Sequence, residues 1–158
     1  MTLINAGSTA FEFDVIEPEA EAFSRTSRAL VRVTVPRAAT APRWLSYVID
    51  RLNELASLVD DPDEELPAPS HDVLSRALDE ANRFMSPATP TPSVVPTTNG
   101  HVQFVWHKAG WDVEVEIQPE ETWVWARDRE SGESWSGSLE AHKGELVSLL
   151  YRMEADLG

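Results

Sequence analysis

The sequence predicts an α+β fold in which an antiparallel β-meander of three or four strands packs against about three helices. Residues 102–128 alternate apolar with polar side chains, which is typical of half-buried strands joined by short turns. Residues 42–59 and 139–157 instead repeat apolar side chains at helical spacing. We expect one domain over residues 1–158, because a chain of this length buries enough apolar surface to fold without metals or disulfides.

Five segments are expected in that domain. They are N-terminal strands with a basic segment (1–41), a helical pair (42–86), a proline-rich connector (87–100), the β-meander (101–138) and a C-terminal helix (139–158). In the first segment, Phe11, Phe13 and Val15 alternate with acidic residues, and residues 29–35 have the sequence ALVRVTV, so we expect two short strands. These strands are candidates for extending the meander.

A basic stretch begins in the first segment. From residue 22 to residue 49 there is no acidic side chain, although the whole chain has a formal charge of −14. The arginines of this stretch are Arg25, Arg28, Arg32, Arg37 and Arg43. We expect the stretch to pack against the acidic sheet of its own chain, and a basic patch reserved for a partner is the alternative.

The helical pair is expected to consist of two amphipathic helices. The first runs from about Pro42 to Val59, with its apolar residues spaced along one face. Ser70 is a suitable N-cap for the second helix, and Asp72 lies in its first turn. The expected apolar stripe of the second helix is Leu74, Ala77, Leu78, Ala81, Phe84 and Met85.

The connector contains four prolines between residues 86 and 96. They exclude a helix and a central strand, and they favour an extended chain. An Asn99-Gly100 turn then leads into the meander, and residues 134–138 are a candidate fourth strand. The last helix is expected from Leu139 to Leu157. Its expected inward residues are Leu146, Val147, Leu149, Leu150, Met153 and Leu157.

The turn of the first hairpin decides which side chains share a face, because a slip of one residue turns every side chain over. We predict a two-residue turn at Ala109-Gly110, or a four-residue loop in the same register, because a three-residue turn would place Phe104 beside Glu114. The predicted pairs are Val102–Ile117, Phe104–Val115 and Trp106–Val113 on the apolar face, and Gln103–Glu116, Val105–Glu114 and His107–Asp112 on the other face.

The second hairpin allows two registers with opposite consequences for Trp123 and Trp125. An odd loop centred on residues 118–120 turns both indoles to the apolar face. An even loop places them beside Glu114 and Glu116 on the solvated face, as an aromatic patch ringed by carboxylates that suits a basic partner. We favour the odd loop, because truncating a buried tryptophan costs about 3–5 kcal/mol.

Composition and charge exclude several classes of function. A chain without cysteine has no disulfide, no thiolate metal site and no cysteine nucleophile. The formal charge of −14 argues against direct binding of nucleic acid, since Lys and Arg make the contacts with phosphate. The first residues do not resemble a signal peptide, and no apolar run approaches the length of a membrane span. We therefore expect a cytoplasmic protein with no membrane partner.

No constellation of residues indicates catalysis, a metal ion or a cofactor. His101 and His107 lie about 20 Å apart on one extended strand, which is too far for them to ligate one metal. No serine lies in a G-x-S-x-G or S-x-x-K motif. Asp112, Glu114 and Glu116 repeat at about 7 Å, close to the phosphate spacing of a DNA strand, although a solvated sheet face also explains them. We expect a non-enzymatic protein without a cofactor.

Short motifs follow one another in a distinctive order from residue 52 onward. They are Leu52-Leu55-Leu58, Pro67-Ala68-Pro69-Ser70, and Pro96-Thr97-Thr98-Asn99-Gly100 with Val102, Phe104 and Trp106. This order resembles a family of small, mostly uncharacterised actinobacterial proteins with a W-D-G-x-G-A-x-P loop and a P-T-x-x-G-x-V-x-x-x-W meander. Residues 61–65, DPDEE, depart from the loop motif. The resemblance implies a partner-binding protein of the kind found in two-gene toxin–antitoxin operons.

These observations predict a non-enzymatic, acidic protein-binding module of the antitoxin or immunity-like kind. The expected partner is a basic protein, which a neighbouring gene is expected to encode. The alternatives are a DNA mimic that occupies a nucleic-acid-binding protein, and a structural protein that forms homodimers or larger homo-oligomers through exposed tryptophans. The candidate partner-binding residues are Asp112, Glu114, Glu116, Trp123, Trp125, Asp61, Asp63 and Glu64.

Overall fold

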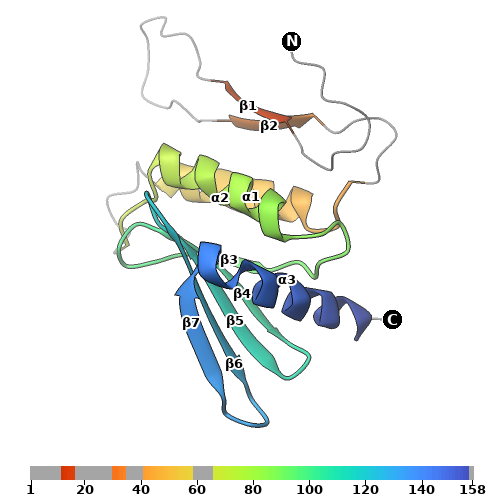
Figure 1. Cartoon of the computed structure of the whole chain (residues 1–158). Coiled ribbons are helices and arrows are strands. Elements are labelled where there is room, and N and C mark those ends of the chain that lie inside the picture. The colour runs from red at the N-terminus through yellow and green to blue at the C-terminus, as the bar shows by residue number, and fades with distance from the viewer. Residues whose placement is uncertain (1–11, 17–29, 35–40, 59–65, 157–158) are drawn as a thin grey trace, which may run out of the picture.

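The computed structural model describes residues 12–16, 30–34, 41–58 and 66–156. Its elements are β1 (Glu12–Ile16), β2 (Leu30–Thr34), α1 (Leu45–Ser57), α2 (His71–Phe84), β3 (Ser93–Pro96), β4 (Val102–Lys108), β5 (Trp111–Ile117), β6 (Thr122–Asp128), β7 (Ser134–Ser138) and α3 (Leu139–Ala155). Strands β3 to β7 form one antiparallel sheet in chain order, and the helices pack on one of its faces (Figure 1). The predicted α+β class is confirmed.

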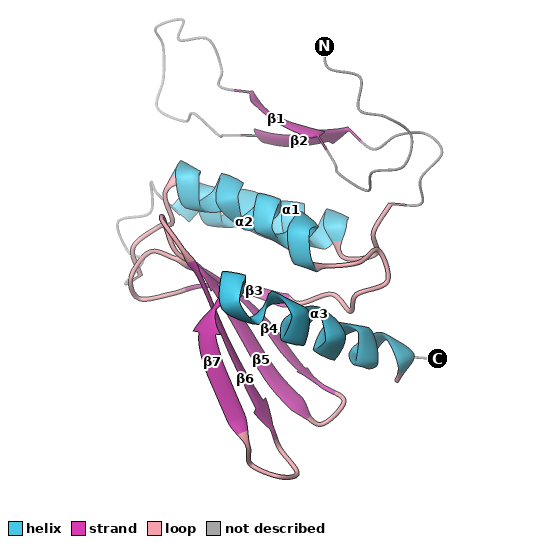
Figure 2. Ribbon diagram, in the orientation of Figure 1, coloured by secondary structure: helices cyan, strands magenta, loops and turns pink. Residues whose placement is uncertain are grey.

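The two N-terminal strands form a sheet of their own instead of extending the meander. β1 pairs antiparallel with β2, and β2 lies beside α1 (Figure 2). The fifth strand of the larger sheet is β3, which lies in the segment expected to be only a connector. β3 pairs with β4 alone, so it is an edge strand, where a sheet tolerates proline. The exclusion of a central strand in this segment is therefore correct.

The helical pair forms as expected, with a difference at the start of α1. The Oγ atom of Ser70 accepts a hydrogen bond from the backbone N–H of Val73 at 3.3 Å, so Ser70 is the N-cap of α2. α1 begins at Leu45 instead of Pro42. The indole N–H of Trp44, just before α1, donates to the carbonyl oxygen of Ser86 at 2.8 Å, which ties the start of α1 to the connector.

The core lies between the sheet and the three helices. α2 packs against β4 and β5, α3 against β6 and β7, and α1 against α2 and β3. The sheet residues buried in it are Val94, Val102, Phe104, Trp106, Val113, Val115, Ile117, Val124 and Ala126. The ring of Phe84 meets those of Phe104 and Trp106 edge-on, at centroid distances of 6.3 and 6.4 Å. The indole N–H of Trp106 donates to the Pro90 carbonyl at 2.7 Å, so this buried donor is paired.

The C-terminal helix begins directly after β7, without a loop. Its N-cap is Ser138, whose Oγ atom accepts a hydrogen bond from the backbone N–H of Ala141 at 3.3 Å. The stripe that it buries is Leu146, Leu149, Leu150 and Met153. The expectation for Val147 is wrong, because it lies one position off this stripe and is 41% exposed. Leu157 lies outside the described residues.

The first hairpin has the predicted register. Lys108 pairs with Trp111, so the turn is Ala109-Gly110, and its φ angles of 51° and 76° are both positive, as in a type I′ turn. The six predicted cross-strand pairs are all present. The Trp106 side of β4 therefore faces the helices, and the His107 side faces away from them.

The second hairpin has the even register, so the odd loop that we favoured is wrong. Its loop is the four residues 118–121, closed by a hydrogen bond from the backbone N–H of Gln118 to the carbonyl of Glu121 at 3.0 Å. Glu114 pairs with Trp125, and Glu116 pairs with Trp123. Both tryptophans consequently lie on the face of the sheet that points away from the helices.

Two features explain the even register. Strand alternation puts Arg127 on the same face as both tryptophans, so the odd register would bury a guanidinium group. The inner positions of β6 that α3 approaches, Val124 and Ala126, are also small, as is Gly137 of β7, while Trp135 of β7 already occupies the inner position beside Ala126. A Cβ atom at Gly137 would lie 2.4 Å from the ring of His142. With the indole of Trp135 already stacked on the His142 ring, this part of the inner face has no room for two more indoles.

Candidate functional site

The face of the sheet opposite the helices is called the outer face below. Its side chains form rows across the strands, because paired residues lie side by side. The first row is Ser93, Val105, Glu114, Trp125 and Ser136, the second is Val95, Gln103, Glu116, Trp123 and Ser138, and the third is His107, Asp112, Arg127 and Ser134. None of the described helices covers this face.

Trp123 and Trp125 give the outer face its apolar area. They lie two residues apart on β6, so their side chains leave the sheet about 7 Å from each other on the same side. Trp123 is 41% exposed, and Trp125 is half-buried. Half-buried Val95 and Val105 lie in the same two rows. The outer face is therefore a mixed surface of aromatic, aliphatic and charged groups.

Each carboxylate of the predicted row has a partner on or next to β4. His101 Nδ1 lies 2.7 Å from Glu116 Oε1, Gln103 Nε2 donates to Glu114 Oε2 at 2.7 Å, and His107 Nδ1 lies 2.8 Å from Asp112 Oδ1. Asp112 Oδ1 also lies 3.4 Å from Arg129 Nε. These contacts hold the carboxylates in place, and Arg129 offsets part of the charge of Asp112. The predicted pairing of His107 with Asp112 is present.

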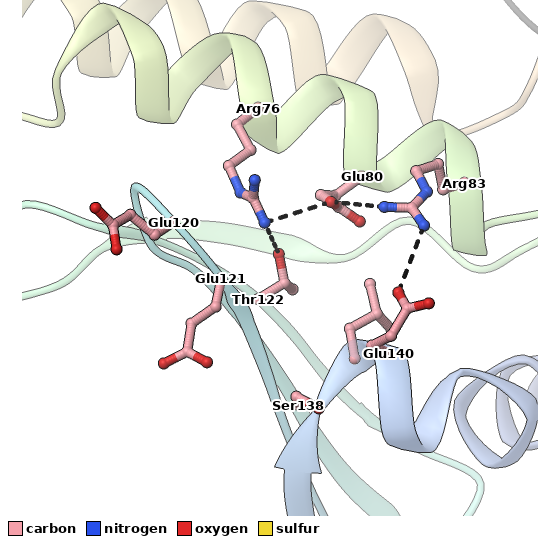
Figure 3. Close-up of a pocket in the computed structure, with 9 residues that line it drawn as sticks. Arg76, Glu80, Arg83, Glu120, Glu121, Thr122, Ser138 and Glu140 are labelled. Carbon is pink, nitrogen blue, oxygen red and sulfur yellow. Dashed lines mark hydrogen bonds and ion pairs between the residues drawn. The ribbon is translucent and has the colours of Figure 1, made fainter.

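A second feature is a polar pocket between α2, the β5–β6 loop and the first turn of α3 (Figure 3). Its volume is about 170 Å³. The residues that line it are Arg76, Glu80, Arg83, Glu120, Glu121, Thr122, Ser138, Leu139 and Glu140. We did not select any of these residues from the sequence.

Glu80 is the buried carboxylate of this pocket, with only 4% of its surface exposed. Its Oε1 atom lies 3.0 Å from Arg83 Nη1 and 3.6 Å from Arg76 Nη2. The same Nη2 atom lies 3.5 Å from the hydroxyl of Thr122, and Arg83 Nη2 lies 3.8 Å from Glu140. Two guanidinium groups on one oxygen offset the cost of removing this carboxylate from water.

The same charged groups influence the pKa of Asp79, which precedes Glu80 on α2. Although Asp79 lies at the surface, desolvation by the surrounding protein atoms and the neighbouring Glu80 carboxylate raise its pKa above the usual value of 3.8. Arg76 and Arg83 act in the opposite direction and offset part of this effect. The charged form of Asp79 is therefore less favourable in the folded protein than in the unfolded chain.

One signal in the sequence pointed to part of the pocket. Arg76, Glu80 and Arg83 are spaced i, i+4 and i+7, which puts them on one face of a helix and predicts ion pairs along it. That face borders the apolar stripe of α2, so a charged residue on it can become buried. No pattern in the sequence indicated that residues 120–122 and 138–140 would close around this face.

Part of the prediction falls outside the described residues. Asp61, Asp63 and Glu64 lie in residues 59–65, which the structure does not describe. The structure also does not describe most side chains of the basic stretch, residues 22–49. Arg43 is described, and its backbone N–H donates to the Pro87 carbonyl at 3.2 Å. Packing of the basic stretch against the acidic sheet therefore stays a prediction.

Comparisons with known proteins found no matching family model, no matching curated protein and no matching solved structure. The resemblance to the actinobacterial family therefore stays a prediction. In the described parts of the chain, no three metal-ligating side chains are placed to hold an ion. No helix in those parts is long and apolar enough to cross a membrane.

Proposed function

We propose that the chain is a non-enzymatic protein-binding module whose outer face binds a basic partner protein. The observation that carries this proposal is the exposure of Trp123 and its position beside Trp125, Glu114 and Glu116. Exposed aromatic side chains that are surrounded by polar groups are typical of the residues that dominate protein interfaces. Covering these indoles removes apolar surface from water, which favours association.

The charges of the outer face favour a basic partner. The chain carries a formal charge of −14, and Asp112, Glu114 and Glu116 lie within reach of anything that covers the tryptophans. Complementary charge speeds association and selects the partner, while the indoles supply most of the affinity. His101 and Gln103 already hold two of the carboxylates in position, so binding costs less side-chain entropy.

The two alternative functions fit this geometry less well. A DNA mimic needs a row of open negative charges, whereas each carboxylate here is bonded to a neighbouring side chain and the row is flanked by indoles. A homodimer through the outer face would bring two acidic rows together, and like charges across an interface are unfavourable. Neither objection applies to a basic partner protein.

A role as an antitoxin or immunity-like protein follows from this mode of binding. Proteins of that kind neutralise a partner by covering it, and they need an interface but no catalytic group. The resemblance to the actinobacterial family points in the same direction. We place the protein and its partner in the cytoplasm, and we expect a neighbouring gene to encode the partner.

Affinity capture with matched variants tests this function. The wild-type chain, a Trp123→Ala/Trp125→Ala double variant and a Tyr151→Ala variant are immobilised and exposed to a lysate of the native host. Tyr151 is an exposed aromatic residue on α3, away from the outer face, so the Tyr151→Ala variant controls for non-specific adsorption through exposed aromatic side chains. We expect a basic protein that the wild type and Tyr151→Ala retain and the double variant loses, and that binds the purified chain directly.

Two results would count against the proposal. The first is that every retained protein binds the double variant as well as the wild type. The second is that the tryptophan-dependent protein is acidic. If duplex DNA displaces that protein from the wild-type chain, the DNA-mimic alternative gains support instead.

A further inference from the structure

Glu80 Oε2 is a buried acceptor that the described residues leave without a hydrogen-bond donor. Buried polar atoms are nearly always hydrogen-bonded, so an exception requires an explanation. Both nearby guanidinium groups approach the other oxygen, Oε1. Figure 3 shows the Glu80 carboxylate above the space that Thr122 and Glu140 border. Because Glu80 lines the pocket, a donor that enters the pocket would supply the partner that this oxygen lacks.

The charges around this oxygen favour a cation. Four glutamates and two arginines line the pocket, which leaves it two negative charges in excess. Glu120 and Glu121 are exposed and form no ion pair with any described residue. Arg76 and Arg83 already pair with Glu80 through their terminal nitrogens, although Arg76 Nε is a buried donor that the described residues leave without an acceptor. The Glu140 carboxylate lies in the first turn of α3, where it interacts favourably with the positive end of the helix dipole. The N-terminus of α3 therefore does not favour an additional anion in the pocket.

We propose that the pocket binds the guanidinium group of an arginine side chain from the basic partner. The group donates to Glu80 Oε2 inside the pocket, while the nearby charges of Glu120, Glu121 and Glu140 make the electrostatic potential at the mouth negative. A guanidinium has five N–H donors in a planar fork, which suits acceptors that lie on several sides. A pocket of about 170 Å³ has room for this group and part of its aliphatic stem.

The position of the pocket connects it with the outer face. Thr122 lines the pocket, and the next residue of β6 is Trp123. Ser138 also lines the pocket, and it pairs with Trp123 across the strands. A partner that covers Trp123 can therefore place an arginine side chain in the pocket. That the arginine comes from the protein partner rests on the proposed function, whereas the affinity of the pocket for a guanidinium group does not.

Titration of the full chain with N-butylguanidinium, followed by backbone amide NMR shifts, tests the proposal. We expect saturable shifts of the amides of Thr122, Leu139 and Glu140. N-butylurea, which has nearly the same shape but no charge, should produce no such shifts. The Glu80→Gln substitution should raise the dissociation constant by about tenfold or more, because it removes an ionic hydrogen bond.

The matched control is Glu130→Gln. Glu130 is an exposed residue of the β6–β7 turn, so this variant has the same net charge as Glu80→Gln but an unchanged pocket. Its dissociation constant for N-butylguanidinium should equal that of the wild type. If Glu80→Gln does not fold, the exposed pair Glu120→Gln/Glu121→Gln decides, with an expected loss of about threefold to tenfold.

Three outcomes would overturn the proposal. They are the absence of saturable shifts with N-butylguanidinium, equal shifts with N-butylurea, and unchanged affinity in a folded Glu80→Gln or Glu120→Gln/Glu121→Gln variant. The Trp123→Ala/Trp125→Ala variant separates this proposal from the proposed function. It should bind N-butylguanidinium as the wild type does, even though it loses the protein partner.

Discussion

Trp123→Ala should cost far less stability than Trp106→Ala, although both remove an indole from the same sheet. Trp106 is 1% exposed, contacts the rings of Phe84 and Phe104, and donates to the Pro90 carbonyl. Its truncation should cost about 3–5 kcal/mol. Trp123 is 41% exposed and makes cross-strand contacts, which contribute roughly 0.2–1 kcal/mol each. Its truncation should cost about 1 kcal/mol.

Thermal unfolding followed by circular dichroism measures this difference. For a chain of this length, 1 kcal/mol corresponds to a shift of about 2–4 °C in Tm. We therefore expect Trp123→Ala to melt a few degrees below the wild type. Trp106→Ala should melt about 10 °C or more below it, or fail to fold. Urea unfolding of the same variants gives the free energies independently.

The tryptophan variants also separate folding from binding. Trp123→Ala should weaken capture of the basic partner by about 2 kcal/mol or more, as truncation of an interface hot spot does. The reasoning is refuted if Trp123→Ala destabilises the fold as much as Trp106→Ala, because Trp123 would then belong to the core. It is equally refuted if Trp123→Ala and Trp125→Ala change neither stability nor binding.

Three further predictions follow from the charges and from the packing of α3. Because the pKa of Asp79 is raised in the folded protein, ionisation of its carboxyl group lowers the free energy of unfolding as the pH rises above 3.8. Asp79→Asn should therefore be more stable than the wild type at pH 7, as measured by urea unfolding. This gain in stability should shrink as the pH falls towards 3.8. Charge reversal to lysine at Glu114 and Glu116 should change the free energy of unfolding by less than about 1 kcal/mol each, yet weaken capture of the basic partner most at low salt. Gly137→Ala should lower Tm, because its Cβ atom would meet the His142 ring at 2.4 Å, and His142→Ala in the same chain should restore part of the loss.

Elements that depend on local patterns could be predicted from the sequence. The N-cap at Ser70 follows from the chemistry of its hydroxyl, and the first hairpin follows from a two-residue turn in which Gly110 readily accepts a positive φ angle. In that hairpin, only one register puts Val102, Phe104 and Trp106 of β4 opposite the apolar residues Ile117, Val115 and Val113 of β5. The turn geometry and the alternation of apolar residues favour the same register there, so the sequence predicts this hairpin unambiguously.

The second hairpin shows where apolar burial alone misleads. The large apolar surface of Trp123 and Trp125 favours the core, and only the odd loop would place both indoles there. The decisive residue was Arg127, which alternation places on the face of both tryptophans and which belongs in solvent. The sequence contains this signal, because Arg127 follows Trp123 and Trp125 at the same alternation along the strand.

The sequence by itself determined the helices, the meander and the residues that alternate on each strand, because these depend on neighbours within a few positions. Only the tertiary structure decided that α3 packs closely over Gly137 and leaves the inner face of β6 to small side chains. It also decided that Glu80 of α2 lies beside Thr122 of β6 and Glu140 of α3. These residues are about forty and sixty positions from Glu80 along the chain, and only the packing of α2 and α3 on one sheet brings their charges together.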